Sequence, residues 1–196
     1  MTKSCLLAGV GGQGTVLASR LIAEAAMNQG KFARTAETIG MAQRGGCVVS
    51  HVRIGDQVFS PLIPQGGADI LIGFEPGEAV RCLSYLKPDG VVVVNQKEIS
   101  PVTASLSGSD YSGETMLAFL KEKVKRLYII DAEPICEACG TAKVLNVALL
   151  GAALSCKVLD ISLQEMEETI KNRLPQRFIE MNLQALHAGA KAGMGE

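Results

Sequence analysis

The feature that most constrains this chain is a run of glycines close to its start. A short apolar segment at residues 5–8 has the character of a buried strand, and Gly9, Gly11, Gly12 and Gly14 follow it. Beyond the last glycine, apolar residues recur with the spacing of one helix face. Strand, glycine turn and helix form the opening of a βαβ unit. The first, second and last of these glycines match the spacing G-x-G-x-x-G.

Such a turn has two interpretations. Glycine adopts positive φ at little steric cost, and its backbone N–H groups stay open to a ligand. The first turn of a helix leaves N–H donors unpaired and carries partial positive charge, so the turn is a candidate phosphate or carboxylate site. The residues concerned are Gly11, Gly12, Gln13 and Gly14. Alternatively, the glycines only allow the helix to pack closely on the strand.

The rest of the chain alternates strands with helices. The Gly55-Asp56 turn predicts that a strand at 48–54 returns at 57–60 as an antiparallel hairpin. Further strands are expected at 31–37, 69–74, 91–94 and 127–130, and helices at 75–86, 114–125, 143–157, 162–174 and 177–187, with 188–196 frayed. We therefore expect a single α/β domain over residues 1–196. It would have a Rossmann-like, mostly parallel sheet with helices on both faces, an antiparallel hairpin addition and a helical C-terminal region.

Composition narrows the classes of function. The chain has 196 residues, of which 47% are hydrophobic and 20% charged, as in a globular domain with a core. Its net charge of −1 offers no basic excess for nucleic acid. No apolar run approaches the ~20 residues of a membrane span, and the start lacks the signature of a signal peptide. We therefore expect a cytoplasmic protein with reduced cysteines and no membrane association.

A second glycine-rich stretch places Arg44 beside Gly45 and Gly46. An arginine held on a glycine loop can clamp a phosphate or carboxylate with two hydrogen bonds; alternatively, it is a surface residue beside a tight turn. Glu37 lies about 20 residues beyond the first turn, where a dinucleotide-binding fold places the acid that binds ribose. The alternative for Glu37 is a solvated carboxylate at a strand end.

The helix expected at 143–157 is apolar almost all round, which indicates burial on more than one side. It belongs either to the core or to a contact with a partner. Gly151 would allow close approach of another helix, and Asn146 needs a hydrogen-bond partner if it is buried.

The remaining motif, a pair of cysteines, is weaker evidence for a functional site. Cys136 and Cys139 form C-x-x-C, but the second pair that a structural zinc site needs is missing, and packing is favoured over a redox role. We find no self-contained set of catalytic residues. The residues alone therefore indicate a binding domain or a subunit.

Taken together, four groups of residues resemble the gamma-type subunits of 2-oxoacid:ferredoxin oxidoreductases. They are Gly9-Val-Gly-Gly-Gln-Gly14; Arg44-Gly45-Gly46 with His51-Val-Arg53; Asn146 with Leu150-Gly151-Ala152; and Asn182, Ala185 and Gly189. The resemblance covers nearly the whole chain. Its most specific part is the pair of glycine loops.

The resemblance implies a complex that decarboxylates a 2-oxoacid, here an aryl pyruvate such as indolepyruvate. The complex forms an acyl-CoA and passes two electrons to ferredoxin. Thiamine diphosphate, [4Fe-4S] clusters and coenzyme A would be held mainly by a large partner subunit. This chain would bind no cofactor or metal tightly and would contribute no catalytic residue.

The resemblance also implies roles for particular residues. The loops at 11–14 and 44–46 would contact coenzyme A, another anion or the partner subunit. Asn146, Leu150 and Gly151 would lie on an interface helix. Ferredoxin would be contacted only indirectly, and the isolated chain would be inactive and could form a homodimer.

Two other functions stay open. One is an NAD(P)-binding Rossmann enzyme or sensor, which rests on the glycine spacing and Glu37. The other is a non-enzymatic adaptor whose glycine turn is only structural.

Overall fold

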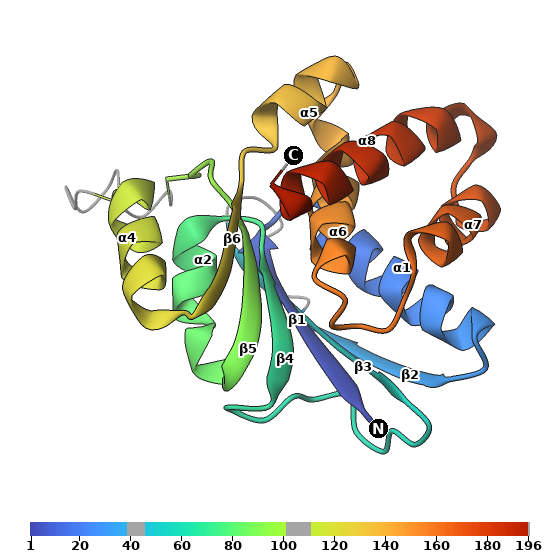
Figure 1. The fold of residues 1–196 in the computed structure, drawn as a ribbon, viewed down its shortest axis with the longest axis horizontal. Helices are drawn as coiled ribbons and strands as arrows, with labels where there is room; N and C mark the ends of the chain where they lie inside the picture. Colours follow the sequence, from blue (N-terminus) through green and yellow to red (C-terminus); the bar gives the residue numbers. More distant parts are fainter. Residues whose placement is uncertain (39–45, 101–110, 196) are drawn as a thin grey trace.

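The computed structural model describes residues 1–38, 46–100 and 111–195, which fold around a six-stranded sheet of order β2-β3-β1-β4-β5-β6 (Figure 1). The strands are β1 (Lys3–Val10), β2 (Phe32–Glu37), β3 (Cys47–Gly55), β4 (Ala68–Gly73), β5 (Leu86–Asn95) and β6 (Arg126–Ile130). The helices are α1 (Thr15–Asn28), α2 (Pro76–Arg81), α4 (Gly113–Lys123), α5 (Glu133–Ala138), α6 (Leu145–Ser155), α7 (Leu163–Arg173) and α8 (Gln176–Met194). Short 3₁₀ turns, η1 (Leu83–Tyr85) and η2 (Ala142–Val144), follow α2 and precede α6.

The sheet is mixed, as expected from the sequence. Strands β1, β4, β5 and β6 are parallel to one another, and β3 is antiparallel to both β1 and β2. The four valines of β5, Val91 to Val94, are fully buried because helices cover both faces of the parallel part. The predicted α/β class with an antiparallel addition is therefore confirmed.

The expected hairpin at 48–54 and 57–60 is wrong in its second strand. Both edges of β3 are already hydrogen-bonded, one to β1 and the other to β2, so no edge is left for residues 57–60. That segment runs instead as a loop, which the Arg53 side chain holds by donating from Nη1 to the Ser60 carbonyl at 3.1 Å. The antiparallel partner of β3 in the addition is β2.

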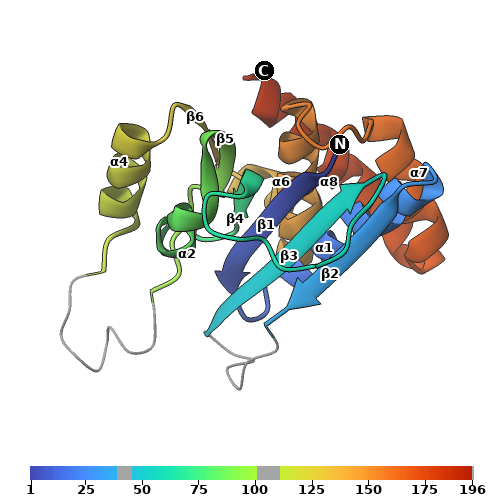
Figure 2. The same cartoon turned by 90° about the horizontal axis from the view of Figure 1, so that it is seen from below.

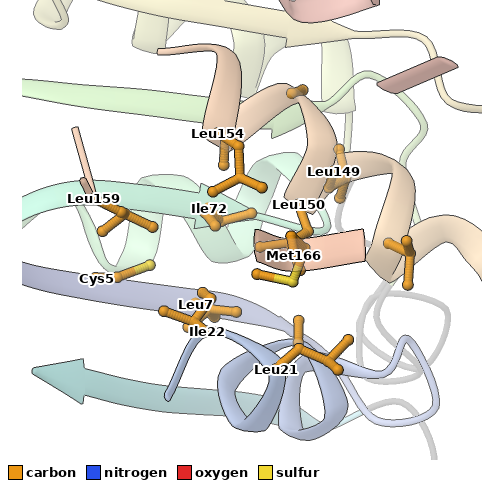
Figure 3. Close-up of a cluster of buried hydrophobic side chains, with 14 of the residues drawn as sticks. Cys5, Leu7, Leu21, Ile22, Ile72, Leu149, Leu150, Leu154, Leu159 and Met166 are labelled. Carbon is orange, nitrogen blue, oxygen red and sulfur yellow. The ribbon is translucent and has the colours of Figure 1, made fainter. Parts of the chain in front are cut away.

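Helices cover the two faces of the sheet unequally. Helix α1 packs on β2 and β3, and α6 packs on β4 and β5 from the same side, whereas α2 packs on β1, β4 and β5 from the opposite side (Figures 1 and 2). The larger core lies on the α1 side, where Leu7, Ile22, Ile72 and Leu150 are almost completely buried (Figure 3). Burying each such side chain contributes about 1.5–3 kcal/mol.

Helix α8 extends further than the sequence predicts. The expected helix stops at 187 and frays, but α8 continues to Met194 because its small residues pack against α6. Gly189 approaches α6 so closely that a Cβ there would lie 1.9 Å from the Ala148 carbonyl oxygen. A Cβ on Gly151 of α6 would likewise lie 2.1 Å from the Leu186 carbonyl oxygen. Residues 188–194, which were expected to fray, are thus helical and pack against α6.

Of the two expectations for the apolar helix at 143–157, the structure supports the core. Leu150 is 0% exposed and Gly151 is buried beneath α8 of the same chain, so neither lies on the surface as the interface helix requires. Asn146 at its start is also buried. All three residues pack inside this chain, and their contact with a partner stays a prediction.

The contact between α6 and α8 gives a stability prediction. Gly189→Ala favours helix formation by about 1 kcal/mol in an open helix, yet here it drives a methyl group into the α6 backbone. We expect the free energy of unfolding to fall by about 3 kcal/mol, measured by urea denaturation. Gln184→Ala, at an exposed position of α8, is the control and should stay within about 0.5 kcal/mol of the wild type. An unchanged Gly189→Ala protein would contradict this packing.

Candidate functional site

The glycine turn joins β1 to α1, and its glycines are there for different reasons. A Cβ on Gly9 would lie 2.8 Å from both Gln13 Oε1 and Phe74 Cβ, so packing excludes any side chain there. Gly14 has φ of 82° and is the N-cap of α1. Gly12 is different: it has φ of 100°, is exposed, and faces open space where a Cβ would meet nothing within 4 Å. Only the tip of the turn is therefore open to a ligand.

The side chain of Gln13 connects the turn to the sheet by hydrogen bonds. Its Oε1 accepts a hydrogen bond from the Val10 backbone N–H at 2.8 Å, and its Nε2 donates to the Phe74 carbonyl at 2.9 Å. The side chain thus bridges the carboxyl ends of β1 and β4, the strands between which the connecting helices change faces. Ligands of open α/β sheets bind at such a point. Gln13 therefore holds the turn in place, and the ligand contact expected of it from the sequence stays a prediction.

The side chain of Asn146 holds the same turn from the other side by a hydrogen bond. Its side chain is 2% exposed, and its Nδ2 donates to the Gly14 carbonyl at 3.3 Å while its Oδ1 accepts from the Val147 N–H at 3.0 Å. A Cβ on Gly14 would lie 2.7 Å from that Nδ2. The partner that the sequence required for a buried Asn146 is therefore the first turn of α1.

The structure brings part of the second glycine loop to the first. The Gly11 N–H donates to the Gly46 carbonyl at 2.9 Å, so the two loops touch at this edge of the sheet. Arg44 and Gly45, the other residues predicted for this loop, lie outside the described residues.

A cleft of about 790 Å³ opens beside the turn, above the carboxyl ends of the strands. One wall is the tip of the glycine turn, and the other comes from the ends of β5 and β6, from α5 and from the start of α6. The lining residues are Gly11, Gly12, Gln13, Asn95, Lys97, Ile99, Ala132, Glu133, Cys136, Glu137, Gly140, Thr141, Ala142 and Leu145. This volume accommodates a small organic ligand.

Asn95, the last residue of β5, is a polar residue of the cleft that sequence reasoning missed. Its side chain is 3% exposed, and Nδ2 donates to the Phe74 carbonyl at 3.3 Å. Its Oδ1 is buried without a hydrogen-bond partner among the described residues. An unpaired buried acceptor costs about 1–3 kcal/mol, which favours a donor from a bound molecule. The available signal was a polar residue at the carboxyl end of a buried strand.

The side chains of the cleft do not make it positive. Lys97 is ion-paired with Glu133, and this hydrogen bond raises the pKa of the lysine. Glu137 adds a second carboxylate to the lining. Among the described residues, the groups that could attract an anion at this end are therefore backbone N–H groups at the tip of the glycine turn and the start of α1.

The C-x-x-C motif lies on and just after α5, and Cys136 lines the cleft. Burial raises the pKa of both thiols, and for Cys136 the neighbouring Cys139 and Glu133 raise it further. A redox-active pair needs the opposite shift, because the thiolate is the reactive form. In the part of the chain that is described, no cluster of three or more His, Cys, Asp or Glu residues could hold a metal ion.

The environment of Glu37 does not match a ribose-binding acid. Strand β3 lies between β1 and β2, so Glu37 is two strands away from the glycine turn. Its carboxylate accepts a hydrogen bond from Ser19 Oγ at 3.2 Å and lies 3.7 Å from Arg20 Nε, both on α1. Glu37 therefore anchors α1 to β2.

Gln13 provides a test that separates folding from binding. Gln13→Ala leaves the Val10 N–H and the Phe74 carbonyl without these partners, so we expect a loss of about 1–3 kcal/mol in thermal or urea unfolding, without any ligand present. Gln13→Glu keeps the acceptor but loses the donor, and should be intermediate or equally unstable. If both variants are as stable as the wild type, the hydrogen bonds of Gln13 do not stabilise the fold.

Comparison with known proteins gives a consistent result. The family described as pyruvate ferredoxin/flavodoxin oxidoreductase matches residues 4–192. Indolepyruvate oxidoreductase subunit IorB of Archaeoglobus fulgidus is 37% identical over 190 residues, which cover 96% of this chain and 94% of the relative. The common subunit gamma of pyruvate/ketoisovalerate oxidoreductases of Pyrococcus furiosus is 30% identical over 186 residues, or 90% of this chain and 89% of the relative.

A solved structure shares the fold. The gamma subunit of a keto/oxoacid ferredoxin oxidoreductase from Geobacter sulfurreducens superposes with a TM-score of 0.75 at 24% identity, covering 100% of this chain and 98% of that one. Among the described residues, no helix is both long and apolar enough to span a bilayer. The match of the family over residues 4–192 and the identity to both relatives show that this chain belongs to the pyruvate ferredoxin/flavodoxin oxidoreductase family.

Proposed function

We propose that this chain is the subunit of a 2-oxoacid:ferredoxin oxidoreductase that does not bind thiamine. The observation that carries the proposal is 37% identity, along 96% of the chain, to an indolepyruvate oxidoreductase subunit. The substrate would be an aryl pyruvate such as indolepyruvate. The complex would release carbon dioxide, form an acyl-CoA and pass two electrons to ferredoxin.

The side chains of the cleft favour a non-catalytic role for this chain in the complex. Its only thiol, Cys136, has a raised pKa, and its lysine, Lys97, is paired with Glu133. We assign no acid, base or nucleophile to this chain. Thiamine diphosphate and the [4Fe-4S] clusters would be held by the large partner subunit.

The chain's own contribution would be recognition of an anion at the glycine turn. The N–H groups of Gly11 and Gln13 already donate to Gly46 and Val10, so the donors for the anion would be the N–H of the exposed Gly12 and those of the first turn of α1. Arg44 would supply the positive side chain that the cleft lining lacks. The anion would be a phosphate of coenzyme A, the carboxylate of the oxoacid or an acidic group of the partner.

The first experiment is affinity purification of this chain from its native cells, grown and lysed without oxygen. Mass spectrometry and an absorbance spectrum of the eluate should reveal a large partner with thiamine diphosphate and iron–sulfur absorption. A chain that elutes alone and colourless would contradict the subunit role. Micromolar binding of NAD to that free chain would support the dinucleotide-binding alternative. If the free chain binds neither NAD nor coenzyme A, the adaptor alternative is supported.

Arg44 is the test of anion recognition. In the purified complex, we expect Arg44→Ala to raise the KM for coenzyme A or the oxoacid about 10- to 100-fold, or to weaken assembly, because a charge-assisted hydrogen bond contributes about 1.5–3 kcal/mol. Arg173→Ala, which removes an exposed arginine paired with Glu24, is the control. Unchanged assembly and unchanged KM values for both substrates would rule out this role of Arg44.

A further inference from the structure

The sheet face opposite α1 is least covered at β2 and at the end of β3, whereas nearer the start of β3 the same face buries His51 against Tyr85 and Ile63. Helix α1 packs on the inner face of these two strands, whereas α2, on the opposite side, packs on β1, β4 and β5. Figure 2 shows the outer face of β2 and β3 with only the loop between β3 and β4 crossing it. A sheet in an isolated domain normally buries one face and solvates the other with polar residues. The residues on this outer face therefore indicate what it meets.

The outer face carries exposed aromatic and aliphatic side chains beside arginines. Strand register pairs Phe32 with Gly55 and Arg34 with Arg53, and both arginines point away from α1. Arg53 Nη1 donates to the carbonyls of Ser60 at 3.1 Å and Leu62 at 3.5 Å, which holds the crossing loop over β3. We call the set formed by Phe32, Arg34, Arg53, Phe59 and Leu62 the β2–β3 face.

The apolar members of this face are unusually open to solvent. Phe59 is 90% exposed, Phe32 60% and Leu62 59%. Single exposed apolar residues need no explanation, but here three gather around two arginines. Aromatic residues and arginine are the types most enriched where protein interfaces hold most of their binding energy. This composition favours a protein partner over a small ligand.

The charges of the face favour an acidic partner. Arg34 and Arg53 stand directly opposite each other on neighbouring strands, an arrangement that destabilises a sheet by like-charge repulsion. Within residues 1–38, 46–100 and 111–195, neither guanidinium forms an ion pair, and Arg53 Nε is buried without an acceptor.

The carboxylates near these strands are already engaged. Glu37 is bound to Ser19 and Arg20 on the α1 side, and Asp56, at the end of β3, binds the amino group of Met1 at 2.8 Å. An acidic side chain from another protein would offset the repulsion.

We propose that the β2–β3 face docks on the thiamine-binding subunit of the complex, with a carboxylate of that subunit against Arg34 and apolar surface against Phe32 and Phe59. The inference rests on the function proposed above and names the surface that serves it. Strand β2 supports it further: it is the edge strand of the sheet, and an open edge is normally covered in a protein that stays soluble. The cleft at the glycine turn lies at the carboxyl ends of the strands, so docking through this face leaves its mouth free.

The test measures the affinity of the full chain for the purified thiamine-binding subunit, without oxygen, by titration calorimetry. We expect Arg34→Glu and Phe32→Ser each to raise Kd at least about tenfold. The affinity of the wild type should fall with added salt, and that of Arg34→Ala should fall less. The matched controls lie on α4, which packs against α2 at the opposite end of the sheet: Lys121→Glu reverses an exposed charge and Phe119→Ser removes an exposed ring, and both should leave Kd unchanged.

Misfolding would not imitate this result. Arg34→Glu converts the repulsion with Arg53 into attraction, so its melting temperature should equal or exceed that of the wild type. If the wild type binds and Arg34→Glu and Phe32→Ser bind within twofold of it, the docking proposal is wrong and the subunit role stands. If the wild type fails to bind the thiamine-binding subunit, both fail. If the isolated chain sediments as a dimer that Phe32→Ser dissociates, the occupant is a second copy and the proposal is overturned.

Discussion

The site depends on two amide side chains, one half-buried and one buried, that hold the glycine turn from opposite sides. Gln13 ties the turn to the end of β4 through Phe74, and Asn146 ties it to the start of α6 through Gly14. Each satisfies backbone groups that a turn and a helix start leave open. Because both amides are engaged within the chain, the turn is already in place before any ligand arrives. What remains available at its tip is backbone, and this is the property that anion recognition by N–H groups requires.

The sequence predicted most of the fold because its signals are local. The valines of β5, the glycine turn and the capping pair Ser162 and Glu165 each depend on residues close in the chain, and all three appear in the structure. The errors at residues 57–60 and 188–194 arose from contacts distant in sequence. Residues 57–60 have no free strand to pair with once β2 and β1 flank β3, and residues 188–194 stay helical because α6 packs against them. The local sequence pattern predicts neither the strand order around β3 nor the packing of α6 on α8.

The candidate site was predictable to a similar degree. The glycine spacing located the turn, but it could not separate Gly9 and Gly14, which packing requires, from Gly12, which faces open space. It also grouped Gln13 with ligand-binding residues, and could not show that this side chain hydrogen-bonds to Val10 and Phe74. Asn95 was missed since its position beside the turn follows from strand order β1-β4-β5, which no local signal gives.

A division of labour explains the remaining features. The cleft holds a lysine already paired, a thiol with a raised pKa and an amide acceptor without a donor, which is a set suited to recognition rather than to bond making. Chemistry on a 2-oxoacid needs groups that this set does not provide, and this agrees with the proposed dependence on another subunit. The β2–β3 face, on which two arginines stand opposite each other, fits the proposed docking on that subunit. Recognition at one edge of the sheet and association through one face can then operate without competing for the same residues.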